Sequence, residues 1–140
     1  MKKLNITFAL LFLFASLMAP PDGRATLYIE YTDPITDPRW ASYEPLVDAI
    51  YHWESHCNPL AYNPKENAVG GFQIRQIRLD DYNKRMGTDH TLEDCYDYEF
   101  SKNMFLYYAE GKSYEQAAKS WNGSGPMTIA YWEGVKRLLL

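Results

Sequence analysis

The chain is predicted to fold as a mainly α single domain with at most a short strand or hairpin. Apolar residues recur at three- and four-residue spacing in several segments, which is the period of an α-helix. These segments begin at residues that cap helices and end at glycine or before proline. Only residues 27–31 alternate like a strand. A length of 140 residues suits one small domain.

Residues 1–25 have the three-part plan of a secretory signal peptide. Two lysines precede an apolar run from Ile6 to about Leu17, and small residues follow. We expect cleavage after Ala25, which places the mature protein outside the cytoplasm, in the periplasm or cell envelope. The apolar run is short for a membrane-spanning helix. The alternative is that this segment is kept as an N-terminal anchor.

The charge of the chain argues against nucleic acid as a partner. The formal charge of −4 becomes about −6 once three cations and one anion leave with the signal segment. No basic run is present, so neither nucleic acid nor an anionic membrane surface is expected to bind. Twelve Tyr and four Trp are many for this length. They either fill the core of a small domain or offer stacking faces to a sugar or peptide.

Along the chain, residues 26–41 are predicted to be a leader segment, because two Asp-Pro pairs interrupt regular structure. The domain is expected to span residues 42–140. Its first helix begins near Ser42 and accepts Pro45 in its first turn. It is predicted to end at Asn58, because the residue before a proline avoids the helical region.

Caps and breakers define the later elements. A loop of about residues 58–71 is followed by a helical segment that ends at Gly87. Two capping boxes, Thr91 with Asp94 and Ser113 with Gln116, each open a further helix. The first of these two helices is predicted to be continuous and to stop near Gly111, and the last helix follows the turn NGSGP.

Glu54 is the candidate catalytic residue. Leu46, Val47, Ile50 and Tyr51 form one apolar stripe, and Glu54 continues it in the last turn of the first helix. Desolvation and the negative end of the helix dipole should both raise the pKa of this carboxyl group. A glutamic acid protonated near neutral pH can protonate a leaving oxygen, as cleavage of a glycosidic bond requires. The alternative is a glutamate rotated to the surface.

Cys57 and Cys95 are candidates for a disulfide in an oxidising compartment. The bond would close a loop of about 39 residues and stabilise the fold by about 4 kcal/mol on the chain-entropy argument. The alternative is two free thiols. No metal site is expected, because His52 and His56 stand at i, i+4 without an HExxH pattern. Both histidines are predicted to lie on the polar side of the helix.

Two motifs resemble those of a known family. The first is Glu54-Ser55, then Asn58-Pro59, then the run from Ala68 to Ile74, AVGGFQI. The second is AAKSWN at residues 117–122, followed by the Gly-Pro turn before the final helix. In this order they resemble soluble lytic transglycosylases of the lysozyme-like superfamily. The resemblance covers about residues 42–140 and implies a lysozyme-like domain.

The resemblance implies a reaction. Glu54 would protonate the glycosidic oxygen between N-acetylmuramic acid (MurNAc) and N-acetylglucosamine (GlcNAc), and would then act as base. The N-acetyl group assists and the 6-hydroxyl attacks the anomeric carbon, which gives a 1,6-anhydro sugar in a lyase reaction. No cofactor or metal is implied. The partners would be peptidoglycan glycan strands, bound by a monomer, and envelope-assembly partners are not identified.

The resemblance also implies substrate-binding residues, and the chain departs from the family pattern at several positions, among them the NGSGP turn, which is one residue longer than the common form. The substrate-binding residues are Ser55, Tyr62, Asn63, Gln73, Trp121 and Asn122. Trp121 stands where tyrosine is usual, which would move the hydrogen-bonding group from a hydroxyl to an indole N–H. Gly71-Phe72 replaces Leu-Met, and Arg75 replaces a commonly apolar residue. Gly70 and Gly71 would let the backbone pass close to the glycan, or simply form a turn.

The main alternatives concern the second carboxylate that glycosidases normally need. Glu66, Asp80 and Asp81 are predicted to be solvated rather than catalytic, which favours a transglycosylase over a lysozyme-type muramidase. A non-catalytic glycan-binding or assembly protein of the same fold is the third hypothesis. A binding module gains nothing from a desolvated acid, so Glu54 argues against it.

Overall fold

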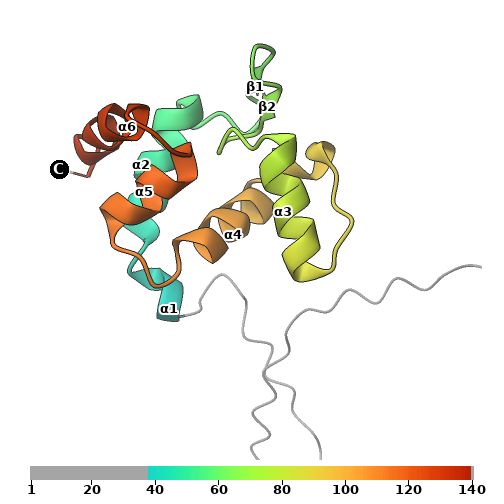
Figure 1. Ribbon diagram of the computed structural model, residues 1–140, viewed down its shortest axis with the longest axis horizontal. Helices are drawn as coiled ribbons and strands as arrows, with labels where there is room; N and C mark the ends of the chain where they lie inside the picture. Colours follow the sequence, from blue (N-terminus) through green and yellow to red (C-terminus); the bar gives the residue numbers. More distant parts are fainter. Residues whose placement is uncertain (1–37, 140) are drawn as a thin grey trace, which may run out of the picture. The chain divides into compact units, whose positions relative to one another are not determined.

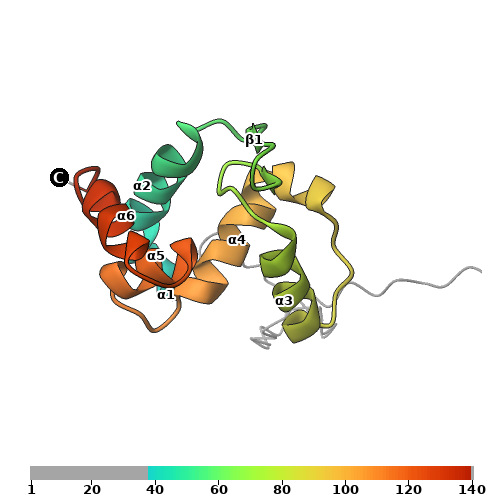
Figure 2. The ribbon, with the colours of Figure 1, turned by 45° about the horizontal axis from the view of Figure 1, so that its top comes forward.

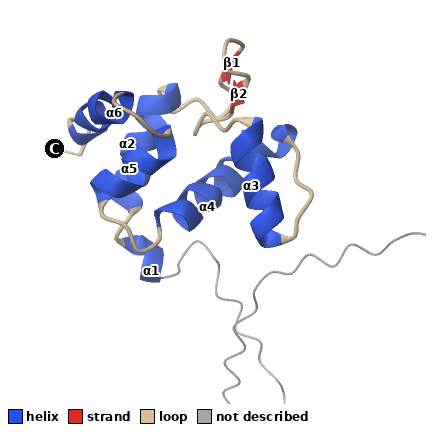
Figure 3. Cartoon of the chain, viewed as in Figure 1, coloured by secondary structure: helices blue, strands red, loops and turns tan. Residues whose placement is uncertain are grey.

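The computed structural model describes residues 38–139 of the chain. The signal segment, the strand predicted at residues 27–31 and most of the leader lie outside the described residues. The predicted fold class is confirmed: the described part is mainly helical with one short two-stranded hairpin (Figure 3). None of the helices in this part is both long enough and apolar enough to cross a membrane.

The elements follow one another along the chain as labelled in Figure 1. They are α1 (Pro38–Ala41), α2 (Glu44–Ser55), β1 (Tyr62–Asn63), β2 (Ala68–Val69), α3 (Gln76–Met86), the 3₁₀ helix η2 (Leu92–Tyr96), α4 (Tyr98–Ala109), α5 (Tyr114–Asn122) and α6 (Met127–Lys136).

The first long helix, α2, ends earlier than the sequence predicts. Pro45 lies in its first turn, as expected, but the helix stops at Ser55. His56 adopts the left-handed conformation (φ 54°) and its N–H bonds back to carbonyls of the last turn; Cys57 is also left-handed (φ 61°). The predicted end at Asn58 was therefore wrong, because a left-handed C-cap without glycine ends the helix before the proline acts.

The predicted caps are confirmed, but the segment after the first capping box is not one helix. Both capping boxes are formed, and Gly87 ends α3 in the left-handed conformation (φ 67°). Asp97 has an extended backbone that separates η2 from α4, and its carboxylate accepts a hydrogen bond from the Phe100 N–H at 2.8 Å. A second N-cap inside the apolar pattern therefore divides the predicted helix in two.

Helix α4 lies at the centre of the described part. Figures 1 and 2 show it between α3 on one side and the group α2, α5 and α6 on the other. It packs against α2, α5 and η2, and α6 packs against both α2 and α5. Large side chains that are almost fully buried fill the space between these helices, among them Leu46, Ile50, Phe72, Met104, Phe105 and Leu106. The core thus fixes α2, α5 and α6 relative to one another.

The hairpin is short and is anchored through its glycines. Its antiparallel strands pair Tyr62 with Val69 and Asn63 with Ala68. A Cβ atom on Gly70 would lie 2.0 Å from the Cys95 carbonyl oxygen, and one on Gly71 would lie 2.1 Å from the Tyr51 ring. Both glycines therefore allow the hairpin base to pack closely on η2 and α2.

Candidate active site

A cleft of about 700 Å³ is lined by residues of α2 and α6 and by residues of the hairpin and α3. We call the α2 and α6 residues that line it the acid side: Trp53, Glu54, Met127 and Tyr131. We call the charged lining residues from the hairpin turn and α3, together with the residue just before α3, the arginine side: Glu66, Arg75, Arg78 and Asp81. The end of α5 contributes Trp121 and Asn122.

Glu54 lies in the cleft, in the last turn of α2. Burial raises the pKa of Glu54 to about 7, and the nearby carboxylate of Glu66 adds to the rise. The hydrogen bond from Tyr131 and the charges of Arg75 and Arg78 lower the pKa without cancelling the effect of burial. The raised pKa predicted from the apolar stripe is confirmed, so a large fraction of Glu54 is protonated at neutral pH.

Tyr131 of α6 fixes the carboxyl group. Its hydroxyl donates to Glu54 Oε1 at 2.6 Å, and its side chain is only 7 % exposed. Burial, and then the negative charge of Glu54, raise the pKa of Tyr131 well above its ordinary value, so the hydroxyl remains a donor. The sequence prediction missed this residue. The one available signal was the apolar stripe of α6, in which Thr128, Tyr131 and Val135 are buried at helical spacing.

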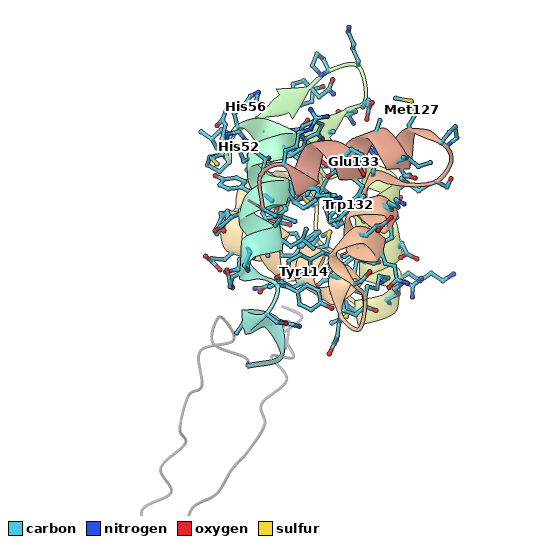
Figure 4. The ribbon with its side chains drawn as sticks, turned by 90° about the vertical axis from the view of Figure 1, so that its left-hand side faces the viewer. His52, His56, Tyr114, Met127, Trp132 and Glu133 are labelled. Atoms are coloured by element: carbon cyan, nitrogen blue, oxygen red, sulfur yellow. The ribbon has the colours of Figure 1, made fainter. Side chains whose placement is uncertain are left out.

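The close approach of α6 to α2 depends on a small residue. A Cβ atom on Gly134 would lie 2.1 Å from the Trp53 ring. The Trp53 ring meets Tyr131 edge-on at 6.1 Å, yet 44 % of the residue remains exposed in the cleft. Met127, at the start of α6 (Figure 4), is 74 % exposed and lines the same cleft. The acid side therefore offers an aromatic and an apolar surface beside Glu54.

Gln73 lines the cleft on a strained turn. Its backbone is left-handed (φ 49°), which is uncommon for a residue other than glycine and costs on the order of 1 kcal/mol. The side-chain Nε2 donates to the Gly70 carbonyl at 3.0 Å, and the Gln73 N–H bonds to the same carbonyl at 3.1 Å. This arrangement holds the amide in place and leaves its oxygen available as an acceptor.

Arg78 and Arg75 line the cleft from α3 and from the residue before it, and neither was among the predicted site residues. The Arg78 guanidinium lies 4.8 Å from the centre of the Tyr108 ring and 4.5 Å from that of Trp121. Its Nη2 donates to the carbonyls of Ser120 (3.1 Å) and Trp121 (2.8 Å) in the last turn of α5. Arg78 therefore joins α3 to α5. No local sequence pattern indicates these hydrogen bonds, because more than 40 residues separate the partners.

Trp121 lines the cleft but does not offer its indole N–H to it. The indole Nε1 donates to the Phe72 carbonyl at 3.2 Å, and the residue is 6 % exposed. Its ring meets Phe72 and Phe105 nearly edge-on. The expectation that Trp121 moves the substrate hydrogen bond to an indole N–H was therefore wrong, because this group already bonds the backbone beside Gln73. Asn122, at the end of α5, is half-buried in the cleft.

The remaining predicted substrate-binding residues separate into two groups. Asn63 lines the cleft, and its Oδ1 accepts from the Lys65 N–H at 3.1 Å. Ser55 and Tyr62 are not among the lining residues. The Ser55 hydroxyl donates to the Tyr51 carbonyl at 3.0 Å, and the exposed Tyr62 donates to Asn67 Oδ1 at 3.2 Å. Ser55 supports the end of α2, and Tyr62 supports the hairpin turn.

The predicted role of Gly70 and Gly71 also changes. Neither residue lines the cleft, and both are buried. Their missing side chains make room for the Cys95 carbonyl and the Tyr51 ring, so they position the loop that carries Gln73 and do not bring backbone to the glycan. Phe72, between that loop and the core, stacks on Tyr51 at 5.6 Å. The Gly-Phe departure from the family pattern is therefore part of one packing arrangement.

The predicted disulfide is absent from the structure. Cys57 and Cys95 are both free; Cys57 is exposed and Cys95 is fully buried. The left-handed turn puts Cys57 at the surface, whereas the Cys95 thiol points into the core and donates weakly to the Thr91 carbonyl. Burial raises the pKa of the Cys95 thiol to about 12. The sequence prediction depended on compartment and number of cysteines, and neither specifies side-chain direction.

The two histidines of α2 lie outside the cleft. His52 and His56 are exposed, and Figure 4 shows them at the edge of the molecule, away from α6. Their rings are 5.5 Å apart. Between residues 38 and 139, no group of three or more His, Cys, Asp or Glu side chains is arranged to hold a metal ion.

Of the three carboxylates predicted to be solvated, Glu66 and Asp81 line the cleft and Asp80 does not. Asp81 accepts from Arg85 and from the Tyr108 hydroxyl, both at 2.7 Å, and these two bonds lower its pKa. Asp81 is therefore ionised, and both bonds are accepted by its Oδ2. Glu66 lies 3.6 Å from Arg75. The prediction of a solvent-facing position is confirmed for Asp81, whose side chain remains 41 % exposed although it also lines the cleft.

No protein-family model, curated protein or solved structure matches the chain. Its function must therefore be inferred from the geometry of the cleft and from the resemblance of its motifs.

Proposed function

We propose that this protein is an exported peptidoglycan lytic transglycosylase of the cell envelope. It cleaves the β-1,4 bond between MurNAc and GlcNAc and forms 1,6-anhydro-MurNAc. The observation that carries the proposal is a half-buried carboxyl group with a raised pKa in a polar cleft. This group, on Glu54, has a pKa of about 7 and is oriented by Tyr131. The order of the motifs around Glu54, Gln73 and Asn122 supports the same assignment.

In the first step Glu54 acts as the acid. Because Tyr131 donates to Oε1, the proton of the neutral carboxyl group belongs on Oε2. Oε2 gives this proton to the glycosidic oxygen as the bond to the anomeric carbon breaks. Burial keeps the proton on the carboxyl group until a leaving oxygen accepts it. A pKa near 7 matches such a donor to neutral conditions.

In the second step the resulting carboxylate acts as the base. The 6-hydroxyl of the same sugar attacks the anomeric carbon, and Glu54 takes up the hydroxyl proton. One bond to the anomeric carbon is lost and one is gained, the proton returns to Glu54, and no water is consumed. The Tyr131 hydroxyl and the charges of Arg75 and Arg78 stabilise the carboxylate between the two steps, as their lowering effect on its pKa indicates.

A muramidase that hydrolyses the same bond is the second candidate function. Hydrolysis by the usual routes requires a second carboxylate as nucleophile or base. Glu66 lines the same cleft and is close enough to raise the pKa of Glu54, which is the observation in favour. Asp81 suits this role less well, because Arg85 and Tyr108 occupy it. A non-catalytic glycan-binding protein would not need the buried acid.

The test is digestion of purified peptidoglycan by the chain without residues 1–25, with mass spectrometry of the products. We expect anhydro-muropeptides, and a loss of at least about a thousand-fold in rate for Glu54→Gln, in the range that general acids contribute. Glu133→Gln is the matched control, because Glu133 is exposed on α6 and does not line the cleft (Figure 4). Products with reducing ends would instead show hydrolysis, and binding without products would leave the non-catalytic function.

A further inference from the structure

Two arginines stand one helical turn apart at the start of α3, and both line the cleft that contains Glu54. Arg75 is the N-cap residue of α3, and Arg78 follows in the first turn, where its N–H bonds to the Arg75 carbonyl at 2.9 Å. The first turn of α3 contains no acidic residue. The partial positive charge of the helix N-terminus therefore adds to two full positive charges.

The Arg75 side chain is available for a ligand. The side chain is 44 % exposed, and its one ion pair among the described residues, from Nη1 to Glu66 at 3.6 Å, is too long to include a hydrogen bond. Within the described part of the chain its guanidinium makes no hydrogen bond, so its fork of N–H donors is open to the cleft. Arginine at such a position is suited to bidentate binding of a carboxylate.

Arg78 provides a second cation that cannot easily move away. The two aromatic rings and the α5 carbonyls hold its guanidinium, and these contacts use only Nη2 as donor. No carboxylate among residues 38–139 lies within ion-pair distance of it. The charge of Arg75 adds to the effect of burial in lowering the pKa of Arg78, which shows that the two cations repel one another. An anion bound beside both would relieve this repulsion.

We propose that Arg75 and Arg78 form a subsite for a carboxylate carried by the glycan substrate. The inference rests on the proposed function, since the cleft must take a glycan, and it adds that the glycan is anionic. In peptidoglycan the carboxylate has two sources. One is the lactyl group of a MurNAc residue without a peptide, and the other is the stem peptide. Neutral polymers of GlcNAc have neither, so the subsite separates peptidoglycan from chitin-like glycans.

The experiment measures binding to the Glu54→Gln protein, in which no ligand is consumed. The ligands are two matched pairs of GlcNAc–MurNAc tetrasaccharides. The first pair is the free lactyl acid and its methyl ester. The second pair carries stem peptides whose carboxylates are either free or amidated. We expect the acid of one pair to bind about ten-fold more tightly than its neutral partner, as a charge-assisted bidentate contact provides. The pair that shows this ratio identifies the source.

The decisive variant is Arg75→Gln, because the Arg75 side chain is exposed and holds no element in place. It should reduce the ten-fold ratio to about one and leave the dissociation constant of the neutral ligand unchanged. Lys84→Gln is the matched control, because it removes the same charge from an exposed position in the last turn of α3. Arg75→Lys keeps the charge without the fork and should retain part of the ratio. Circular dichroism of each variant checks that α3 is intact.

The inference is overturned if neither acid binds more tightly than its neutral partner, or if Arg75→Gln leaves the ratio as it was. Failure of all four ligands to bind overturns it as well. The proposed function is judged separately, by anhydro products from the protein that retains Glu54. A ratio that disappears in Arg75→Gln, in a protein that forms no product, supports the subsite and contradicts the enzyme. Formation of anhydro products without such a ratio supports the enzyme and contradicts the subsite.

Discussion

The acid side and the arginine side of the cleft differ in how they treat charge. On the acid side, Tyr131 is buried and Glu54 is half-buried between two packed helices, and this burial favours the neutral carboxyl group. On the arginine side, Glu66 and Arg75 are largely exposed and lie 3.6 Å apart. The candidate acid thus lies where the protein is less exposed to water, and the charges that adjust its pKa lie where the protein is more exposed.

Charged residues of the arginine side both raise and lower the pKa of Glu54 on the acid side. Glu66 raises the pKa of Glu54, whereas Arg75 and Arg78 lower it. The three residues belong to the hairpin turn and to the first turn of α3, so the position of this segment sets the proton affinity of an acid on another helix. Changes on the two sides should therefore have distinguishable effects on the stability of the protein and on its pH dependence.

The largest expected effect is on the attachment of the arginine side. Gly70→Ala should destabilise the protein by about 3 kcal/mol, because the new Cβ would lie 2.0 Å from the Cys95 carbonyl and the backbone is left-handed (φ 75°). Urea unfolding measures this change. Gly87→Ala is the control: it has a similar φ of 67° with no atom within 4 Å, so it should cost only about 1 kcal/mol. Equal losses for both would show that the contact with Cys95 is unimportant.

Next in size is the stability gained by removing the buried acid. The pKa of Glu54 is about 7 in the folded protein, against an ordinary 4.5, so the folded state binds more protons between these pH values. Stability is therefore fully present below about pH 4.5 and declines as pH rises to about 7, by about 3 kcal/mol in total. Glu54→Gln should remove this decline.

The measurement is the free energy of unfolding at pH 4.5 and pH 8. Glu54→Gln should be more stable than the unaltered protein at pH 8 by up to about 3 kcal/mol, with a much smaller difference at pH 4.5. Glu66→Gln, on the exposed side, serves as the control and should show no comparable change. A Glu54→Gln protein with the original pH dependence would mean that the carboxyl group is not desolvated.

Tyr131→Phe should lower the rate of anhydro product formation by about ten-fold, since the carboxylate formed in the first step loses a hydrogen bond. It should also raise the pKa of Glu54, because this bond lowers it in the unaltered protein. The alkaline limb of the profile, on which kcat/KM falls as pH rises past about 7, should move to higher pH. A pH–rate profile tests both effects, and a limb that moves to lower pH would contradict the assignment.

The smallest expected effect is that of Glu66→Gln. Loss of this negative charge should lower the pKa of Glu54 and move the same limb to lower pH, opposite to Tyr131→Phe. Because Glu66 is exposed, the shift should shrink as salt is added. Profiles at low and high ionic strength measure it. Loss of all activity, with no shift, would point instead to a catalytic carboxylate and to the muramidase.

Local signals accounted for most of what the sequence could predict. The apolar stripe placed Glu54 on the inner face of α2, and the capping boxes marked the starts of η2 and α5 correctly. Both signals act within a few residues. The second cap at Asp97 and the left-handed end at His56 were missed because the longer apolar pattern and the nearby proline were given more weight.

Contacts between distant segments could not be predicted in this way. The bond from Tyr131 to Glu54 joins residues 77 positions apart, and Arg78 reaches the end of α5 across 43. No periodicity connects such pairs, since they depend on how α6 and α5 dock onto the core. The direction of Cys95 likewise followed from packing of η2, and the number of cysteines did not indicate it.

The Tyr131–Glu54 bond also sets an order of events during synthesis. The ribosome adds Glu54 to the chain long before Tyr131. The acid-side residues around the carboxyl group belong to α2 and α6, which are far apart in the sequence. A nascent chain that has reached only Asn122 contains the glutamate but not the helix that buries it and donates to it. In such a chain Glu54 lacks the hydroxyl group that orients its carboxyl group. Glu54 is therefore synthesised early, but its carboxyl group acquires the contact with Tyr131 only when α6 docks.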